Sequence, residues 1–328
     1  MGFVAGMVSL RETYVRLREH FGPLTGAGAL RPWWPIFGDD PPFEMLVGAV
    51  LVQQTRWETV EAAVLRLLAA GLLNPPALAG SDPATLAALI RPAAFHAQKA
   101  PGLIAIARHL CAHHGGSMIK LLAQPTDTLR CELLSLPRIG PETCDVIMLY
   151  GGGHPVFVVD EYTRRLFERV GVEPEALTPS FWRRARYEAA RQQIEGDLGQ
   201  VFAGDQPATG GSAFAVGAST GAPIASSAPG VPRGLDVRAE GVHPPATAHD
   251  HRSFGAASHQ LASLYAEFHA QINEACVRYC LARPRCDGPP ARRVYSAQEG
   301  RESYLGYHSG CPLRPICGYY QRGGAQER

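Results

Sequence analysis

A tight turn between two predicted helices, followed 20 residues later by a single acidic residue, constrains the fold of this chain more than any other feature. The segment LPRIG at 136–140 ends one helical pattern, and Pro141 begins the next. Proline suits the first position of a helix, because its missing N–H would have no partner there. The backbone N–H groups around Gly140 would then be free to bind a phosphate. Twenty residues after Gly140, an apolar run ends at Asp160.

Helical patterns cover most of the remaining chain. Ser9, with Glu12 three residues later, is a capping box. The only candidate strand is the short run VFVV at 156–159. The sequence therefore predicts an all-α fold. The expected helices cover 9–21, 43–70 (two helices with a break near Thr55), 83–91, 96–114, 125–135, 141–150, 160–170, 179–198 and 256–281.

Residues 203–255 have a different composition from the rest. They are rich in Gly, Ala, Ser, Thr and Pro, contain no lysine and show no apolar period. Such a segment buries too little surface to offset the entropy lost on ordering. We expect a flexible insertion here.

Composition and charge leave the class of partner open. With 46% hydrophobic and 19% charged residues, the chain is typical of globular proteins. No apolar run reaches the roughly 18–20 residues of a membrane span, and the N-terminus lacks the features of a secretory signal. We therefore expect a cytoplasmic protein without membrane contacts. The net charge is +1, but the arginines are bunched, which suits either local phosphate-binding faces or ordinary solvated helices.

Five of the eight cysteines fall within the last 53 residues. In a chain that shows no export signal, such a cluster favours metal or iron–sulfur ligation over disulfides. The five are Cys276, Cys280, Cys286, Cys311 and Cys317.

The hairpin and its aspartate together resemble the helix-hairpin-helix DNA glycosylase superfamily, which includes endonuclease III. The resemblance implies a two-lobed helical fold that binds double-stranded DNA containing damaged bases. It also implies a nucleoid-associated monomer. It makes Asp160 the carboxylate that stabilises positive charge on the sugar as the base departs. Asp160 also suits a helix N-cap, and the two roles are compatible. The residues expected to contact DNA are Arg138, Ile139, Gly140 and Arg164.

Glu142 stands where the family's strand-cutting members carry a lysine (IGPET against IG-x-K-T). An amine at that position attacks the sugar and forms a Schiff base, which a carboxylate cannot do. An acid is also favoured in the first turn of any helix by the helix dipole. In either case, the lyase nucleophile is missing.

The endonuclease III branch ends in a [4Fe-4S] loop with the spacing C-x6-C-x2-C-x5-C. Cys280, Cys286, Cys311 and Cys317 resemble this pattern, but 24 residues separate the second from the third. An insertion there is tolerable, because the ends of the loop can still meet at the cluster. Cys276 is an alternative first ligand. A four-cysteine zinc site and unligated cysteines are the other interpretations.

A more specific resemblance is to the 3-methyladenine DNA glycosylase III subgroup, a monofunctional branch. It rests on RPWWP at 31–35 and on segments 43–61, 90–104 and 261–272. Alkylated purines are already cationic and leave readily, so such an enzyme needs aromatic stacking more than a general acid. The resemblance places Gln53 in the gap left by the flipped base. It implies a base pocket lined by Trp33, Trp34, Pro35 and Trp57.

The chain departs from that subgroup at three points. Gln271 replaces a lysine in the last helix, the cysteine loop is additional, and Arg138 replaces the first hairpin glycine, where a positive φ would be strained. An endonuclease III-like enzyme for oxidised pyrimidines or mismatches is therefore an alternative. A non-catalytic DNA-binding protein is another, although pure binding would not require Asp160.

The resemblance also implies the domain organisation. We expect a helical barrel lobe at 41–170, with the hairpin at 136–150. A cluster-side lobe is expected at 171–202 and 256–281, and it also receives the N-terminal helix and Trp-containing segment at 1–40. The insertion at 203–255 and the cysteine loop and tail at 276–328 complete the chain.

Overall fold

The computed structural model describes residues 8–26, 29, 33–172, 181–203, 255–291 and 309–323. The expected insertion, except for its end residues Ala203 and Gly255, lies outside this part. The helices are Leu10–Phe21 (α1), Pro41–Leu51 (α2), Trp57–Ala69 (α3), Pro75–Ala79 (α4), Pro83–Leu89 (α5), His96–His114 (α6), Met118–Leu122 (α7), Thr126–Ser135 (α8), Pro141–Val146 (α9), the π-helix Ile147–Gly151 (η1), Glu161–Val170 (α10), Phe181–Arg184 (α11), Tyr187–Ala203 (α12), Ala256–Arg278 (α13) and Gly318–Gln321 (α14).

The expectation of an all-α fold is confirmed. The candidate strand at 156–159 is extended but pairs with no other strand among the described residues. Its amides bond to side chains instead, from Phe157 N to Glu195 Oε1 (2.8 Å) and from Val159 N to the Tyr187 hydroxyl (3.3 Å). Within the described ranges, no helix has the length and apolarity needed to cross a membrane.

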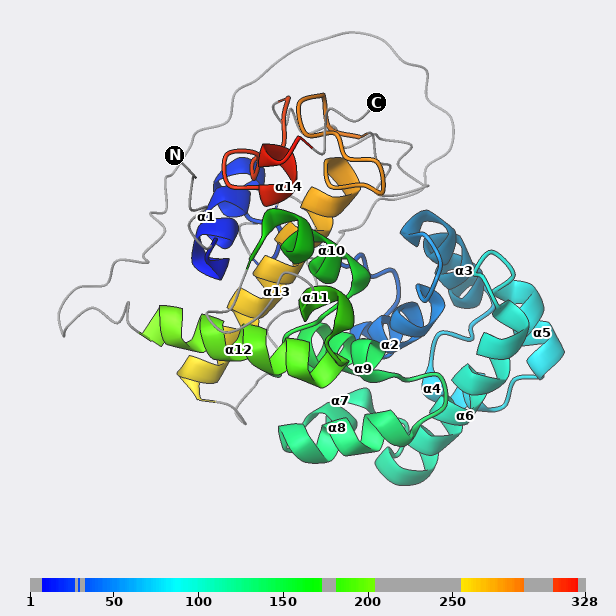
Figure 1. Cartoon of the computed structure of the whole chain (residues 1–328). Coiled ribbons are helices and arrows are strands. Elements are labelled where there is room, and N and C mark those ends of the chain that lie inside the picture. Colours follow the sequence, from blue (N-terminus) through cyan, green and yellow to red (C-terminus); the bar gives the residue numbers. More distant parts are fainter. Residues whose placement is uncertain are drawn as a thin grey trace, which may run out of the picture.

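The helices form two groups (Figure 1). In the first group, α6 contacts α2, α4, α5 and α7, α3 and α9 join through α2, and α8 joins through α9. In the second, α13 contacts α1 and α10, α12 joins through α1, and α11 and α14 join through α10. The sequence analysis placed 160–170 in the first lobe, and this is wrong: α10 contacts α11, α13 and α14. The reason is its apolar face, on which Phe167 packs against Trp182 of α11 (ring centroids 5.0 Å apart) and Phe268 of α13 (6.0 Å).

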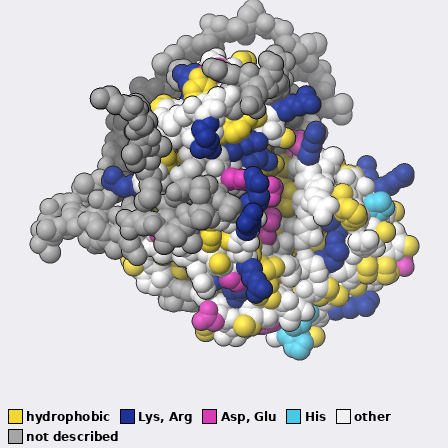
Figure 2. Space-filling model, viewed as in Figure 1, with side chains coloured by type: hydrophobic (Ala, Val, Ile, Leu, Met, Phe, Trp, Pro, Cys, Tyr) yellow, Lys and Arg dark blue, Asp and Glu magenta, His cyan; other side chains and the backbone are white. Residues whose placement is uncertain are grey.

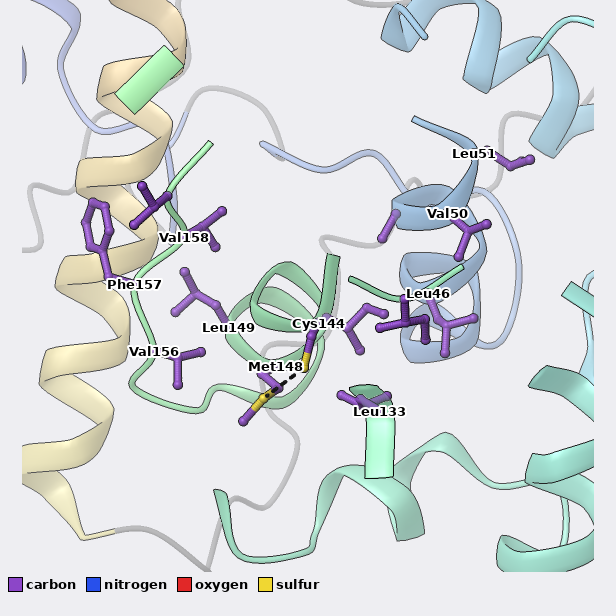
Figure 3. Close-up of a cluster of buried hydrophobic side chains, with 14 of the residues drawn as sticks. Leu46, Val50, Leu51, Leu133, Cys144, Met148, Leu149, Val156, Phe157 and Val158 are labelled. Atoms are coloured by element: carbon purple, nitrogen blue, oxygen red, sulfur yellow. Dashed lines mark hydrogen bonds between the residues drawn. The ribbon is translucent and has the colours of Figure 1, made fainter. Parts of the chain in front are cut away.

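The second helix of the hairpin, α9 continuing into η1, joins the two groups. Its buried side chains Cys144 and Met148 lie beside Leu46 of α2 and Leu133 of α8 (Figure 3). The extended segment that follows packs its buried Phe157 against α13, with ring centroids 5.6 Å from Tyr265. The hairpin is therefore held by the core on both sides, and its turn keeps a fixed position.

A buried ionic network also crosses the junction. Asp145 of α9 is fully buried and lies 3.0 Å from Arg130 of α8 and 3.8 Å from Arg191 of α12. Glu188 pairs with the same two arginines, at 2.6 and 2.9 Å. Removing Arg130 would leave the buried Asp145 without its nearest partner, and breaking such a buried pair costs about 3–5 kcal/mol.

Candidate active site at the junction of the two helical groups

Asp160 lies at the junction, as the N-cap of α10. Its Oδ1 accepts hydrogen bonds from the amide (2.7 Å) and the hydroxyl (2.8 Å) of Thr163. Its Oδ2 accepts one from Asn273 (3.0 Å) and lies 3.4 Å from Nε2 of His269. Burial disfavours the charged form, but the hydrogen bond and charge of His269 and the two donors of Thr163 outweigh it, so the pKa of Asp160 is lowered. Asp160 is therefore a carboxylate at neutral pH.

His269, Asn273 and Tyr150 are site residues that the sequence analysis missed. His269 and Asn273 lie four residues apart on one face of α13, a spacing that could have drawn attention to them. The Tyr150 hydroxyl, on η1, lies 2.6 Å from Nδ1 of His269 and 3.2 Å from the carbonyl of Ala266. Burial, followed by the charges of Asp160 and Glu267, raises the pKa of Tyr150 well above its ordinary value, so its hydroxyl keeps its proton.

The aromatic residues predicted for the base pocket lie on the other side of Tyr150. Trp34 packs edge-on against Trp57 (centroids 5.1 Å apart) and lies 6.3 Å from Tyr150. A Cβ on Gly48 of α2 would come within 3.1 Å of the Trp34 ring, so the indole packs closely against the backbone of α2. Trp33, Trp34, Pro35 and Trp57 are all partly buried. The indole Nε1 atoms of Trp34 and Trp57 are buried without a hydrogen-bond partner among the described residues.

The position of the tryptophan segment is fixed by a buried carboxylate. Glu44 of α2 accepts hydrogen bonds from the amides of Phe37 (2.9 Å) and Gly38 (2.7 Å). These contacts hold the chain directly after Pro35 against α2, which carries Gly48. The tryptophan segment and α2 are therefore bonded together.

The hairpin turn adopts the conformation that the sequence analysis called strained for an arginine. Arg138 has φ of +68°, the left-handed region that favours glycine. Its side chain lies over Gly102 of α6, where an added Cβ would come within 2.5 Å of the Arg138 Cγ. Ile139 is buried and Gly140 is exposed as the N-cap of α9, with no side chain capping the helix.

Gln53 contacts the hairpin. Its side-chain amide donates to the carbonyl of Arg138 (2.7 Å) and to the hydroxyl of Thr143 (2.9 Å). Beneath it, the fully buried Lys99 donates to the carbonyls of Leu51 and Gln53, both at 2.8 Å. Burial, followed by the charge of Arg138, lowers the pKa of Lys99 to about 8. The ammonium group of Lys99 thus caps the end of α2 and holds Gln53 in place.

Glu142 lies in the first turn of α9, near Asp160. Its side chain reaches solvent, yet desolvation and then the negative charge of Asp160 raise the pKa of Glu142 to about 7. The hairpin thus places a second titratable carboxyl beside the first.

The arginines of α10 bind main-chain carbonyls. Arg164 donates to Trp182 (2.7 Å) and Ala185 (3.0 Å), and Arg165 donates to Cys280 (2.9 Å). Arg169 donates to the carbonyl of Ala282 (3.1 Å). Basic and acidic side chains alternate along the middle of the face shown in Figure 2, over α10 and α11. A role of Arg164 in DNA contact stays a prediction.

Four of the five C-terminal cysteines line one pocket, together with residues of α10. The amide of Cys311 donates to the carbonyl of Cys286 (2.8 Å), so the ends of the long insertion between them meet. Cys276 instead points its thiol at the carbonyl of Tyr162 (3.4 Å). The four lining cysteines are Cys280, Cys286, Cys311 and Cys317.

Comparison with known proteins identifies the family. Residues 47–191 match the model of the HhH-GPD superfamily base excision DNA repair proteins. A putative DNA repair glycosylase of Methanocaldococcus jannaschii is 36% identical over 168 residues, which cover 51% of this chain and 71% of that protein. This chain belongs to the HhH-GPD superfamily. The matched region of this HhH-GPD protein contains Glu142 and Asp160, whereas Trp33 to Pro35, His269 and the cysteine pocket lie outside it.

Two further relatives are more distant. Endonuclease III of Thermotoga maritima is 33% identical over 130 residues, which cover 40% of this chain and 57% of that protein. A crystal structure of H. pylori 3-methyladenine DNA glycosylase bound to 1,N6-ethenoadenine superimposes with a TM-score of 0.54 and 23% identity, over 81% of this chain and 96% of that one. This HhH-GPD protein therefore shares its fold with that enzyme. Its family and its 36% identical relative, covered to 71%, make it a base excision repair DNA glycosylase.

Proposed function

We propose that this glycosylase releases alkylated purines such as 3-methyladenine from duplex DNA and leaves the strand intact. The observation that carries the proposal is the pair of packed indoles, Trp34 and Trp57, which Tyr150 and His269 connect to Asp160. Two buried indole N–H groups without a partner suit a ligand that supplies acceptors. Aromatic faces attract a cationic base, and such a base leaves without prior protonation. No general acid is needed.

Asp160 is the catalytic carboxylate in this proposal. As the N-glycosidic bond breaks, its electron pair leaves with the base and positive charge develops on the sugar. A carboxylate held by fixed donors stabilises that charge without reorganising. Water then attacks the sugar carbon, and the carboxylate can orient it. His269, Asn273 and Thr163 keep Asp160 ionised and oriented.

The absence of strand cleavage rests on the supply of lysine side chains. The whole chain contains two lysines, Lys99 and Lys120. Lys99 is fully buried and donates to carbonyl groups, so it cannot attack a sugar without breaking the end of α2. Lys120 lies on α7, outside the site. The hairpin position that would require a lysine is occupied by Glu142.

We also propose that the four-cysteine pocket holds a [4Fe-4S] cluster. No three of the thiols among the described residues lie within 4.8 Å of one another. A single tetrahedral zinc with Zn–S bonds of about 2.3 Å would bring them to about 3.8 Å, whereas a cubane cluster needs a wider cage. The cluster would supply no chemistry to base release. The cysteines would use it to fix the loop against α10 through Arg169, which donates to the Cys280 thiol (3.4 Å).

The function is tested with a panel of duplexes that each carry one lesion, assayed with and without alkali. We expect release of 3-methyladenine or a related alkylated purine, with nicks only after alkali. Release of oxidised pyrimidines or mismatched bases with spontaneous nicking would favour the endonuclease III-like alternative. Binding without release of any base would favour a non-catalytic DNA-binding protein.

A further inference from the structure

A second cluster of chemically active side chains lies away from the active site, where the C-terminal end of α6 meets α8. Nε2 of His109 and Nε2 of His114 each lie 2.6 Å from the same atom, Oε1 of Glu132. The three ligand atoms all lie within 4.8 Å of one another, the only such group among the described residues. Figure 2 shows histidine side chains gathered at the lower edge of that face, toward α6 and α8.

The arrangement is unusual for hydrogen bonds alone. Two imidazole groups converge on one carboxylate oxygen at a distance shorter than the usual 2.7–3.2 Å of an N–H···O bond. The other oxygen of Glu132 is occupied by the amide of Gln124 (2.6 Å), which fixes the orientation of the carboxylate. A carboxylate ligand oriented by an outer hydrogen bond is typical of metal sites.

Two imidazole nitrogens and one carboxylate oxygen are a donor set that suits zinc. A tetrahedral zinc with bonds of about 2.0–2.1 Å would hold its ligand atoms about 3.3 Å apart. Each histidine would need to retract by less than about 1 Å from Glu132 to reach that spacing. The three side chains are 13–24% exposed, so an ion can enter and a water can complete the coordination.

The dipole of α6 also favours a metal cation at this position. His109 and His114 lie in the last two turns of α6, where the helix dipole favours a cation. We propose that His109, His114 and Glu132 form a Zn²⁺ site that ties the end of α6 to α8. Because α8 leads directly into the hairpin turn at Leu136, the site braces the helix that precedes the hairpin.

The test is zinc binding to the full chain with its cysteines intact, measured by equilibrium dialysis against Zn²⁺. Wild type should bind one zinc more than His114→Ala or Glu132→Gln, since loss of a ligand should weaken binding by more than about tenfold. His113→Ala is the matched control: it removes an exposed histidine next to His114 that is outside the ligand set, and its stoichiometry should equal that of wild type. Any zinc at the cysteines is common to all four proteins and cancels.

X-ray absorption at the zinc edge gives a readout that does not depend on the variants. The extra zinc should show nitrogen and oxygen neighbours at about 2.0–2.1 Å and no sulfur shell at about 2.3 Å. A sulfur shell, or equal zinc stoichiometry in wild type and in variants with wild-type helical content by circular dichroism, would overturn the proposal. In that event the cluster is an ordinary hydrogen-bonded triad.

Discussion

The Tyr150 hydroxyl lies 2.6 Å from Nδ1 of His269, and this contact sets which edge of the imidazole faces Asp160. Tyr150 comes from the π-helix at the end of the hairpin, and His269 comes from α13. The Asp160 carboxylate is thus oriented by residues 10 and 109 positions away in the chain, brought together by the junction of the two helical groups. Several measurable properties depend on this arrangement.

Asp160→Asn should abolish base release while leaving binding to abasic DNA intact. Asparagine caps a helix about as well as aspartate, so the start of α10 should persist. The loss of the charge should reduce single-turnover release by at least roughly 10²–10³-fold, the cost of removing one preorganised electrostatic group. Glu161→Gln, the next residue, is the control and should keep most activity. Turnover by Asp160→Asn would exclude Asp160 as the catalytic carboxylate.

Loss of His269 should shift the pH dependence of base release as well as its rate. His269 is the largest of the influences that lower the pKa of Asp160, so His269→Ala should raise that pKa. Activity requires the carboxylate, and the acid limb of the kcat/KM profile should therefore move to higher pH. Tyr150→Phe should cost about tenfold in rate, the value of one hydrogen bond of about 1.4 kcal/mol. A residue with a purely structural role would lower the profile without moving its acid limb.

Glu142 should make DNA binding pH-dependent. Its pKa is raised to about 7, so the side chain is neutral below pH 7 and negative above it. A negative charge at the hairpin repels phosphate, and affinity for abasic duplex should fall as the pH rises from 6 to 8. Glu142→Gln should remove most of this fall. An unchanged pH dependence in that variant would show that another group is responsible.

Borohydride should fail to trap a covalent adduct between the protein and abasic DNA. Trapping needs an accessible amine, and Lys99 is bonded to carbonyls inside the protein. An endonuclease III-type lyase assayed in parallel provides the positive control. Glu142→Lys should gain weak trapping if the hairpin places residue 142 against the sugar. Strong trapping by wild type would contradict the monofunctional proposal.

The purified protein should contain about four irons per chain and show the broad visible absorption of a thiolate-ligated cluster. Cys311→Ser and Cys317→Ser should each lose iron and lower the melting temperature, because both thiols line the pocket against α10. Cys131→Ser is the matched control, since that thiol is exposed on α8, and should keep its iron. A colourless protein with stoichiometric zinc at these cysteines would refute the cluster.

Local features of the structure were predictable from the sequence, and long-range ones were not. Pro141 and Ser9 act through neighbours within four residues, so their roles at helix starts could be read directly. The Glu12 side chain nevertheless pairs with Arg16 (3.0 Å) and does not complete the capping box. The assignment of α10 to the first lobe failed because which helix Phe167 packs against depends on α13, about a hundred residues later.

The candidate active site shows the same difference between local features, which were predicted, and long-range contacts, which were not. Asp160 and Glu142 were found because they belong to one continuous motif. His269 and Asn273 were missed because their importance comes only from contact with Asp160 across 109 and 113 residues. Arg138 does have the positive φ that the sequence analysis considered strained. The sequence offered no way to see that Gly102 makes room for the arginine side chain.

The Arg138–Gly102 contact also imposes an order on how this sequence can change over evolutionary time. While Arg138 is present, any side chain at position 102 must displace it, since even a Cβ there would come within 2.5 Å. Replacement of Arg138 by glycine would remove this obstacle and the left-handed strain of about 1–2 kcal/mol together. A substitution at 102 therefore requires either another conformation of the Arg138 side chain or its prior loss. The residue at 138 thus limits which residues are tolerated at 102. In a relative with glycine at 138, this limit on position 102 would be absent.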